Sequence, residues 1–580
     1  MAQQARGSMA RKQSSKAQAK GQRLHQEKRF EAAIPHLEEA LTARPDDFDL
    51  LARLGECYFH LCQYARTREL LEKAIVHKPK DAQTHNTLSC LLTSEQYAPE
   101  GALFFISLGN AYSGLHQYEH AASAFKKALE LEPGSRAAVN NLANLEKDLG
   151  HFDDALARFA QIEEGWDCAY SNKLITMHYH PDIPPAMITQ ACRRWNDLFA
   201  PQTPAQRPVP SDRSPDRVLR LGLISDGLRG HPVGHMMIRA IERLPVGHFE
   251  LFFYSSSNKE DHITERLKAH AQAWHSIAYL DDDQLYARLQ ADRVDILLEL
   301  SGHNNGNRMP VVARAPAPLI VKWVGGLINT TGVEAIDYLL SDAVETPPGV
   351  DEDYSEKLIR LPDDYICYDP PRYVPPVAEL PARRNGFVTF GCFNNPTKLN
   401  HRLLAQWATL LQATGNSRLY LKGHQFNEPE RVRQIKEQLL AHGIAEERLR
   451  IEGPTTLHEA LLTCYNQVDI ALDPWPYSGG LTTCEALLMG VPVVTHPGPT
   501  FAGRHSATHL VNAGLPELVA ESWEVYHQRV LELAGDLDNL ATIRRHLREV
   551  LRSSPVCDGA RFANHFTRAL RAIWQRDCAG

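Results

Sequence analysis

The sequence predicts an α + α/β protein in which an α-solenoid of helical repeats precedes two Rossmann-like lobes. Two patterns support this prediction. Small and aromatic residues recur at a fixed interval between about residues 22 and 165, and from Arg217 onward short apolar strands alternate with helical segments. With 580 residues, the chain has room for roughly three to four domains of ordinary size.

The composition excludes several classes of protein. Hydrophobic residues make up 43% of the chain and charged residues 23%, as in an ordinary soluble globular protein. The formal net charge of −8 disfavours general nucleic-acid binding, which needs a basic surface. The 11 cysteines form no CxxC pair and no zinc spacing, so we expect reduced thiols in a cytoplasmic protein. The N-terminus lacks the apolar core of a secretory signal, and no stretch approaches the roughly 20 apolar residues of a membrane helix, so we expect neither nucleic acid nor membrane as a partner.

The interval in the N-terminal part is 34 residues. It separates Pro45 from Pro79 and Ala121 from Ala155. A 34-residue period of small residues with a closing proline is typical of tetratricopeptide (TPR) repeats, in which each helix pair leaves an apolar face that its neighbour covers. Such arrays present a concave surface that binds proteins or peptides. We therefore predict a disordered tail at 1–21, TPR repeats at 22–165 and a helical linker at 166–215.

The rest of the chain alternates strands and helices, which predicts parallel sheets covered on both faces. In the first lobe, 216–380, strands are expected at Val218–Ser225, Phe249–Ser255, Val294–Leu300, Leu319–Val324 and Ile336–Leu340. In the second lobe, 381–555, they are expected at Phe387–Phe393, Arg418–Lys422, Leu449–Glu452, Val468–Leu472 and Val491–Thr495. A C-terminal helix at 556–580 completes the chain. Ligands of such sheets bind beyond the carboxyl ends of the strands.

The most informative stretch follows the strand Val468–Leu472. Ser478-Gly479-Gly480 leads into a predicted helix at Leu481–Met489. The first N–H groups of a helix have no internal partner, and the helix dipole adds partial positive charge, so such a turn binds anions. Phosphates are expected on Gly480, Leu481, Thr482 and Thr483, and the carboxylate of Glu485, one turn further, can accept two ribose hydroxyls. The alternative is an ordinary strand-turn-helix unit with a tight glycine turn.

The first lobe contributes histidines to the predicted cleft. His231 follows the first strand and precedes a proline, so we expect it to cap a helix and to act as a base or orient an acceptor hydroxyl. His235 lies one turn later, and Asp226, His303 and Gly325 follow strand ends. The alternative for each histidine is a structural role. No third ligand accompanies the two histidines of the helix, so no metal is expected.

Two residues of the second lobe complete the predicted site. Lys398 follows the first strand, where an ammonium group can stabilise a leaving diphosphate. His458 follows the third strand, where nucleotide bases are often held. The alternative for Lys398 is an ordinary surface lysine.

TPR repeats followed by two such lobes resemble the protein O-GlcNAc transferase family, whose catalytic part has the two-lobed GT-B fold. The resemblance covers about residues 23–575. The chain is similar to bacterial-type members of the family, because the array is short and no domain separates the lobes. Its motifs are Asp226, His231 and His235; Tyr354-Ser355-Glu356-Lys357-Leu358; Phe393, Asn394 and Lys398; and Gly480, Thr482 and Glu485.

The resemblance implies inverting transfer of N-acetylglucosamine from UDP-GlcNAc to Ser or Thr hydroxyls of proteins, with no metal and no other cofactor. It implies that Lys398 stabilises the leaving UDP and that Asn395 lies near the diphosphate. It also implies that Gly480–Thr482 hold phosphates and that Glu485 binds the ribose. His231 would be the base, or would orient substrate while the α-phosphate takes the proton.

This sequence departs from animal members of the family at several positions, and two alternatives to the implied function stay open. Animal members have His and Thr where Gly480 and Leu481 stand, and basic residues where Leu461 and Cys464 stand. A plant branch of similar architecture transfers fucose from GDP-fucose, so a protein O-fucosyltransferase is one alternative. A non-catalytic TPR scaffold that binds nucleotide is the other.

Overall fold

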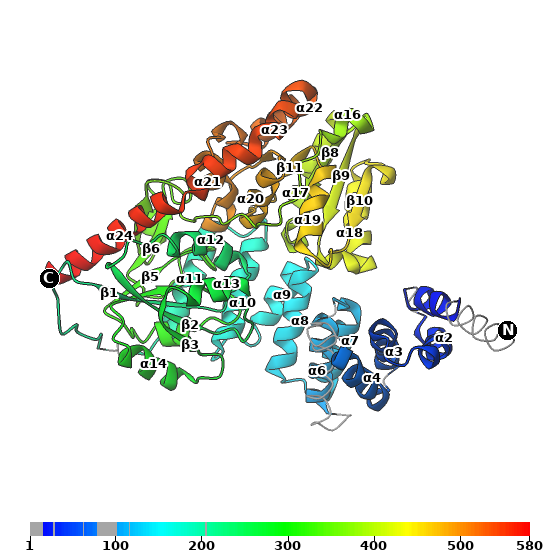
Figure 1. Cartoon of the computed structure of the whole chain (residues 1–580), viewed down its shortest axis with the longest axis horizontal. Helices are drawn as coiled ribbons and strands as arrows, with labels where there is room; N and C mark the ends of the chain where they lie inside the picture. Colours follow the sequence, from blue (N-terminus) through cyan, green and yellow to red (C-terminus); the bar gives the residue numbers. More distant parts are fainter. Residues whose placement is uncertain are drawn as a thin grey trace, which may run out of the picture. The chain divides into compact units, whose positions relative to one another are not determined.

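A computed structural model describes residues 16–26, 29–61, 63–77, 101–114, 116–202 and 206–579 of the chain (Figure 1). The chain divides into two compact units, 1–145 and 146–580.

The first unit is helical. Its elements are helical residues 16–26, α2 (Phe30–Ala43), α3 (Phe48–His60), α4 (Tyr64–His77), α6 (Ala102–Gly114) and α7 (Tyr118–Leu131). Small residues sit where helices touch: a Cβ on Gly55 would lie 2.6 Å from Leu71, and one on Gly109 would lie 2.4 Å from Phe125. This close approach explains why the repeat needs glycine there.

Two predictions for this unit concern the disordered tail at 1–21 and the repeat residue Pro79. Residues 16–21 are helical, so the predicted disordered tail is wrong for that part, and residues 1–15 lie outside the described residues. Pro79, one of the residues that define the 34-residue period, also lies outside them.

The helical array continues into the second unit. Its helices there are α8 (Arg136–Asp148, which begins in the first unit), α9 (Phe152–Phe159), α10 (Asp167–Tyr179) and α11 (Pro185–Phe199). Trp195 of α11 is fully buried, and a Cβ on Gly332 of the first lobe would lie 1.9 Å from the Cys192 carbonyl oxygen. The predicted linker at 166–215 is therefore helical as far as Phe199, without helix in its described residues beyond that point, and it packs directly on the first lobe.

The first lobe is a seven-stranded sheet in the order β3-β2-β1-β4-β5-β6-β7, and all its pairings are parallel. The strands are β1 (Leu219–Ser225), β2 (Phe249–Ser255), β3 (Ala271–Ser276), β4 (Ile296–Glu299), β5 (Leu319–Lys322), β6 (Tyr338–Asp342) and β7 (Lys357–Leu361). The helices are α12 (Pro232–Ile241), α13 (His262–Lys268), α14 (Asp282–Ala291) and α15 (Met309–Val312). All five predicted strands form, and the two edge strands β3 and β7 were not predicted.

The second lobe is a parallel sheet in the order β10-β9-β8-β11-β12. Its strands are β8 (Val388–Cys392), β9 (Ser417–Lys422), β10 (Leu449–Glu452), β11 (Ile470–Leu472) and β12 (Val493–Val494). Its helices are α16 (Pro381–Asn385), α17 (His401–Ala413), α18 (Pro429–Ala441), α19 (His458–Cys464), α20 (Leu481–Leu488), α21 (His505–Asn512) and α22 (Trp523–Gly535). Two Rossmann-like lobes in one chain are the predicted GT-B architecture.

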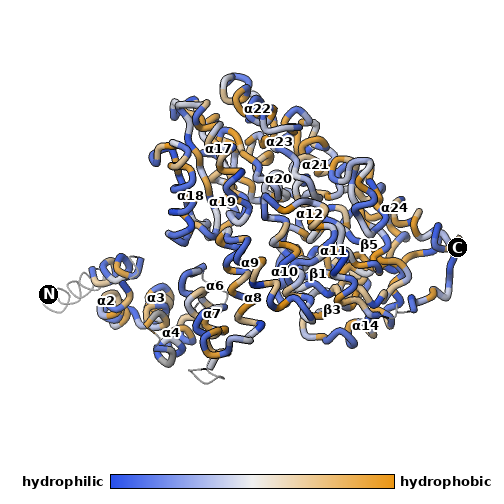
Figure 2. The backbone as a smooth tube through the Cα atoms, turned by 180° about the vertical axis from the view of Figure 1, so that it is seen from behind, coloured by the Kyte–Doolittle hydropathy of each residue, from blue (hydrophilic) through white to orange (hydrophobic). Residues whose placement is uncertain are grey.

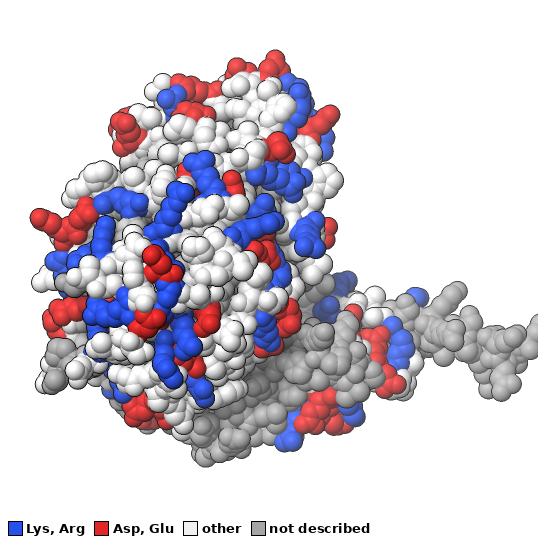
Figure 3. Space-filling model, turned by 60° about the vertical axis from the view of Figure 1, so that its left-hand side comes forward, with Lys and Arg blue, Asp and Glu red and all other residues white. Residues whose placement is uncertain are grey.

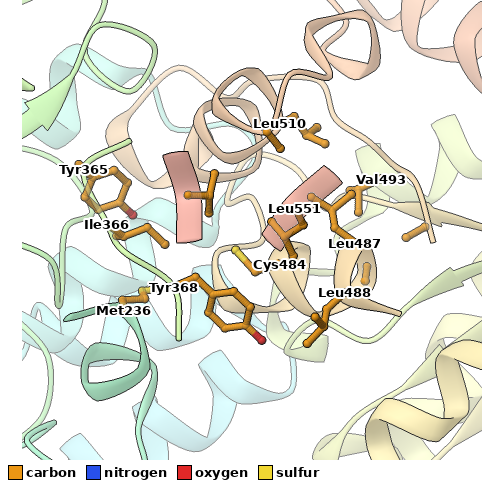
Figure 4. Close-up of a cluster of buried hydrophobic side chains, with 14 of the residues drawn as sticks. Met236, Tyr365, Ile366, Tyr368, Cys484, Leu487, Leu488, Val493, Leu510 and Leu551 are labelled. Carbon is orange, nitrogen blue, oxygen red and sulfur yellow. The ribbon is translucent and has the colours of Figure 1, made fainter. Parts of the chain in front are cut away.

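The C-terminal helices tie the lobes together. After α23 (Leu537–Ser553), α24 (Gly559–Ala579) returns to the first lobe (Figure 1), where Phe566 packs 4.7 Å from the ring of Trp323. Figure 4 shows the apolar cluster that joins the lobes, with Met236 of α12 and Tyr368 near Cys484 of α20. The lobes therefore share one core, which fixes the helices that carry the predicted site.

The outside of the molecule is polar and its charges are mixed. Figure 2 shows hydrophilic segments along α18 and hydrophobic ones at strands such as β5. On the face in Figure 3, basic and acidic side chains are interspersed. Ion pairs such as that of Arg561 with Asp363 join opposite charges.

Candidate functional site

Asp473 shapes the glycine turn that follows β11. Its carboxylate is buried and accepts hydrogen bonds from the Gly479 N–H at 2.8 Å and from the Thr495 hydroxyl at 2.7 Å. Burial raises the pKa of Asp473 to about 6. The turn then leads to Gly480, which caps α20. The first amides of α20 are thus presented as expected for an anion site.

The two threonines of α20 have different partners. The Thr482 hydroxyl donates to Asn394 Oδ1 at 2.9 Å and is partly exposed. Thr483 is buried and its hydroxyl is hydrogen-bonded to that of Ser506 at 2.7 Å. Thr482 therefore lies on the open side of the turn, whereas the Thr483 side chain points into the protein and offers a ligand only its backbone.

Lys398 lies over the turn. It ends a 3₁₀ turn at Pro396–Lys398, and its ammonium group donates to the Ser478 carbonyl at 2.6 Å and to Asn394 Oδ1 at 3.1 Å. The ammonium nitrogen also lies 4.5 Å from the centre of the Tyr477 ring. Burial lowers the pKa of Lys398 to about 8. A partly desolvated ammonium group is thus fixed beside the N-terminus of α20.

Asn395 caps the 3₁₀ turn beside the predicted diphosphate site. Its Oδ1 accepts from the Thr397 N–H at 3.1 Å and from Gln425 Nε2 at 2.9 Å. These bonds cap the 3₁₀ turn that carries Lys398. The preceding residue, Asn394, contacts both Lys398 and Thr482, so it occupies the place nearest the anion turn.

Glu485 and His458 form a pair. Glu485 is 4% exposed, and its Oε1 lies 2.7 Å from His458 Nε2. The hydrogen bond to Glu485 raises the pKa of His458. The other ring nitrogen, Nδ1, is hydrogen-bonded to the Tyr373 hydroxyl at 2.9 Å. The carboxylate is therefore held at the end of a three-residue chain.

On the first lobe, His231 caps α12 as predicted. Its Nδ1 accepts the Val233 N–H at 3.3 Å, and burial lowers its pKa. His235 lies one turn later, and burial lowers its pKa too. Asp226 lies 3.4 Å from Arg229 in the loop after β1.

Two predicted cleft residues have structural roles. His303 is 2% exposed, and its two ring nitrogens lie 3.0 Å from the Ser171 hydroxyl and 2.7 Å from the Thr331 carbonyl. A Cβ on Gly325 would lie 2.0 Å from the Leu300 carbonyl oxygen. Both ring nitrogens of His303 thus have protein partners, and Gly325 is where the loop approaches Leu300 closely. Their assignment to the cleft surface stays a prediction.

The two halves of the site meet at α12 and α20. The position of a Cβ on Gly480 lies 3.3 Å from Met236 Cε, so the helix that His231 caps touches the anion turn. Tyr179 of α10 stacks on Tyr477 at 5.0 Å. The site thus combines an anion turn, an ammonium group and a buried carboxylate, which suits a nucleoside diphosphate. Sequence reasoning missed Asp473, Tyr477 and Tyr373.

The described residues contain neither a candidate metal site nor a candidate membrane-spanning helix. Within the described ranges, no group of three or more His, Cys, Asp or Glu side chains is arranged to hold a metal ion. No helix in the described part of the chain is long and apolar enough to cross a membrane.

Comparison with known proteins agrees with this arrangement. The model of glycosyl transferase family 41 matches residues 202–380 and 377–566. Tetratricopeptide repeat models match residues 24–89 and 102–135. The family match spans both lobes and includes every candidate site residue.

Individual relatives are similar over most of this chain. The probable UDP-N-acetylglucosamine–peptide N-acetylglucosaminyltransferase SPINDLY of Solanum lycopersicum is 34% identical over 71% of this chain and 45% of its own. The probable enzyme of the same kind named SEC from Arabidopsis thaliana is 26% identical over 65% of this chain and 39% of its own. The chain thus spans less than half the length of these curated relatives. A mutant of Thermobaculum terrenum O-GlcNAc transferase matches with a TM-score of 0.80 and 32% identity, over 92% of this chain and 98% of that one. The chain therefore belongs to glycosyl transferase family 41.

Proposed function

We propose that this protein transfers N-acetylglucosamine from UDP-GlcNAc to Ser or Thr hydroxyls of proteins, with inversion at the anomeric carbon and without a metal ion. The observation that carries the proposal is the placement of Lys398, Thr482 and Glu485 around the N-terminus of α20. The N-terminus and Lys398 suit a diphosphate, and Glu485 suits a ribose.

The proposed reaction is one displacement. The acceptor hydroxyl oxygen forms a bond to the anomeric carbon of the donor, and the bond from that carbon to the β-phosphate oxygen breaks. The leaving UDP gains negative charge, which the Lys398 ammonium and the first amides of α20 stabilise. In other transferases a metal ion neutralises the charge of the leaving diphosphate. We propose that these positive groups neutralise it here, so that no metal ion is needed.

His231 is proposed to orient the acceptor rather than to deprotonate it. Because its Nδ1 accepts the Val233 N–H, the neutral ring carries its proton on Nε2 and can only donate there. Its lowered pKa keeps the ring neutral near pH 7. The proton of the acceptor hydroxyl then passes to an α-phosphate oxygen of the donor.

The TPR repeats are proposed to recruit protein acceptors. Helical repeat arrays present extended surfaces that bind peptides, and the names of the curated relatives specify a peptide as acceptor. An array attached directly to the catalytic lobes would raise the local concentration of a bound acceptor.

The test begins with calorimetric binding of UDP-GlcNAc, UDP, GDP-fucose and GDP, with and without EDTA. Selective UDP binding that EDTA leaves unchanged supports the proposal, and selective GDP binding transfers the assignment to protein O-fucosylation. The second step measures transfer of radiolabelled sugar to proteins of a cell lysate by wild type, Lys398→Ala and Lys436→Ala. Lys436 is the control residue, because it lies on α18 and its ammonium group pairs with Glu446. Nucleotide binding with no transfer by wild type would favour the scaffold alternative.

A further inference from the structure

Tyr373 lies in the connector between the lobes, the segment between the end of β7 at Leu361 and the start of α16 at Pro381. The connector runs from the end of the first lobe to α16. The Tyr373 side chain is 42% exposed, yet its hydroxyl lies 2.9 Å from His458 Nδ1 and its ring packs edge-on against the imidazole at 5.8 Å. A connector residue thus reaches the candidate ribose site.

The connector around Tyr373 is fixed to the second lobe. Arg548 donates to the Pro375 carbonyl at 2.6 Å, and Arg544 donates to the Ala378 carbonyl at 2.8 Å. Both arginines belong to α23. Because the backbone is held on its C-terminal side, Tyr373 is presented to His458 in a defined position rather than on a loose loop.

The contacts of His458 specify how Glu485 is presented. Among the described residues, His458 is the hydrogen-bond partner of the Glu485 carboxylate, at Oε1. The described residues place no hydrogen-bond partner on the second oxygen, Oε2. The Tyr373 hydroxyl can donate to Nδ1 of the neutral ring and can accept from the protonated ring, so it holds the imidazole in both states.

We propose that Tyr373 is a positioning residue for the nucleoside half of the donor. Its hydroxyl holds His458, and His458 fixes the Glu485 carboxylate so that it accepts the ribose hydroxyls. This inference rests on the proposed function. It also makes the segment that joins the lobes part of the nucleotide site.

The test is Tyr373→Phe, which removes the hydroxyl and keeps the ring. Calorimetry is done with UDP, GDP, their 2′,3′-dideoxy analogues and inorganic pyrophosphate. Loss of one hydrogen bond should weaken binding of the ribonucleotide that wild type prefers about 3- to 10-fold. The affinity for the dideoxy analogue should fall less, so the ratio of ribonucleotide affinity to dideoxynucleotide affinity falls. The affinity for pyrophosphate should not change. Tyr279→Phe is the matched control, because Tyr279 is 86% exposed and its hydroxyl contacts only Asn258 among the described residues.

A double-mutant cycle separates positioning from general stability. In a His458→Ala background, Tyr373→Phe should have no further effect on the affinity ratio, because the hydroxyl acts through the imidazole. An unchanged ratio in the single variant, or an equal loss for pyrophosphate, would overturn the role of Tyr373 alone. Failure of wild type to bind either ribonucleotide would overturn the donor assignment and this inference together.

Discussion

Replacing Lys398 by methionine should abolish most donor turnover and, at neutral pH, make the protein more stable. Methionine keeps a side chain of similar length and removes the charge. Loss of one preorganised group that stabilises developing negative charge typically costs about 10²- to 10³-fold in kcat. The expected gain in stability comes from the cost of holding an ammonium group in a partly dry site.

The size of the gain follows from the pKa. Burial lowers the pKa of Lys398 from 10.5 to about 8, which corresponds to ~3 kcal/mol at about 1.4 kcal/mol per unit. The hydrogen bonds to the Ser478 carbonyl and Asn394 are lost with the ammonium and offset ~1–2 kcal/mol of this. A net gain of ~1–2 kcal/mol in the free energy of unfolding remains for the variant.

The pH dependence distinguishes this reasoning from a change in packing. The folded-state pKa of Lys398 lies below the unfolded one, so the cost is fully present below about pH 8 and disappears as the pH rises towards 10.5. The variant should therefore melt at a higher temperature than wild type at about pH 7, and this advantage should be lost near pH 10, where only the missing hydrogen bonds remain. Thermal unfolding at both pH values checks this, with Lys436→Met as control. A variant that melts lower than wild type at neutral pH would refute the argument.

Three further outcomes follow from the site. Because Lys398 loses its proton above about pH 8 in the free protein, kcat/KM for the donor should fall above that pH. The bound diphosphate stabilises the ammonium, so kcat should stay constant to a higher pH, and the pH dependence of both rate constants checks this. Glu485→Gln should weaken nucleoside diphosphate binding about tenfold or more in calorimetry, leave pyrophosphate binding unchanged, and lower the pKa of His458 measured by NMR. Gly325→Ala should lower the melting temperature strongly, because its Cβ would lie 2.0 Å from the Leu300 carbonyl oxygen; unchanged stability would show that the loop can move aside.

Much of the fold could be predicted because local signals coincide with it. The ten predicted strands all form, since each is a short apolar run bounded by turns. The edge strands were missed for a physical reason. Β3 reads Ala-Gln-Ala-Trp-His-Ser and is only partly buried, so it carries neither an apolar run nor a clean alternation. The C-terminal helix was predicted at 556–580, and α24 spans Gly559–Ala579.

The candidate site could be predicted only where one segment carries the chemistry. The glycine turn, Lys398 and His231 each follow a strand, and a strand end in a parallel sheet is where ligands bind. Tyr373, by contrast, is an ordinary residue in a proline-rich connector, and its contact with His458 spans 85 residues. The structural role of His303 likewise depends on Ser171, 132 residues away. Sequence spacing contains no signal for either contact.

The charges of Lys398 and Asp473 at the anion turn suit the proposed diphosphate ligand. Lys398 and Asp473 are both desolvated, and burial moves their pKa values towards neutrality, to about 8 and about 6. Asp473 is occupied with the Gly479 amide and the Thr495 hydroxyl, so it holds the turn in shape and leaves Lys398 bonded to uncharged oxygens of Ser478 and Asn394. In the proposed reaction, a diphosphate at the turn would supply the charged partner that Lys398 lacks, and the attraction would grow as the leaving group gains charge. The free protein thus holds a cation in place before its anion arrives, which is the preorganisation that stabilises a transition state more than a ground state.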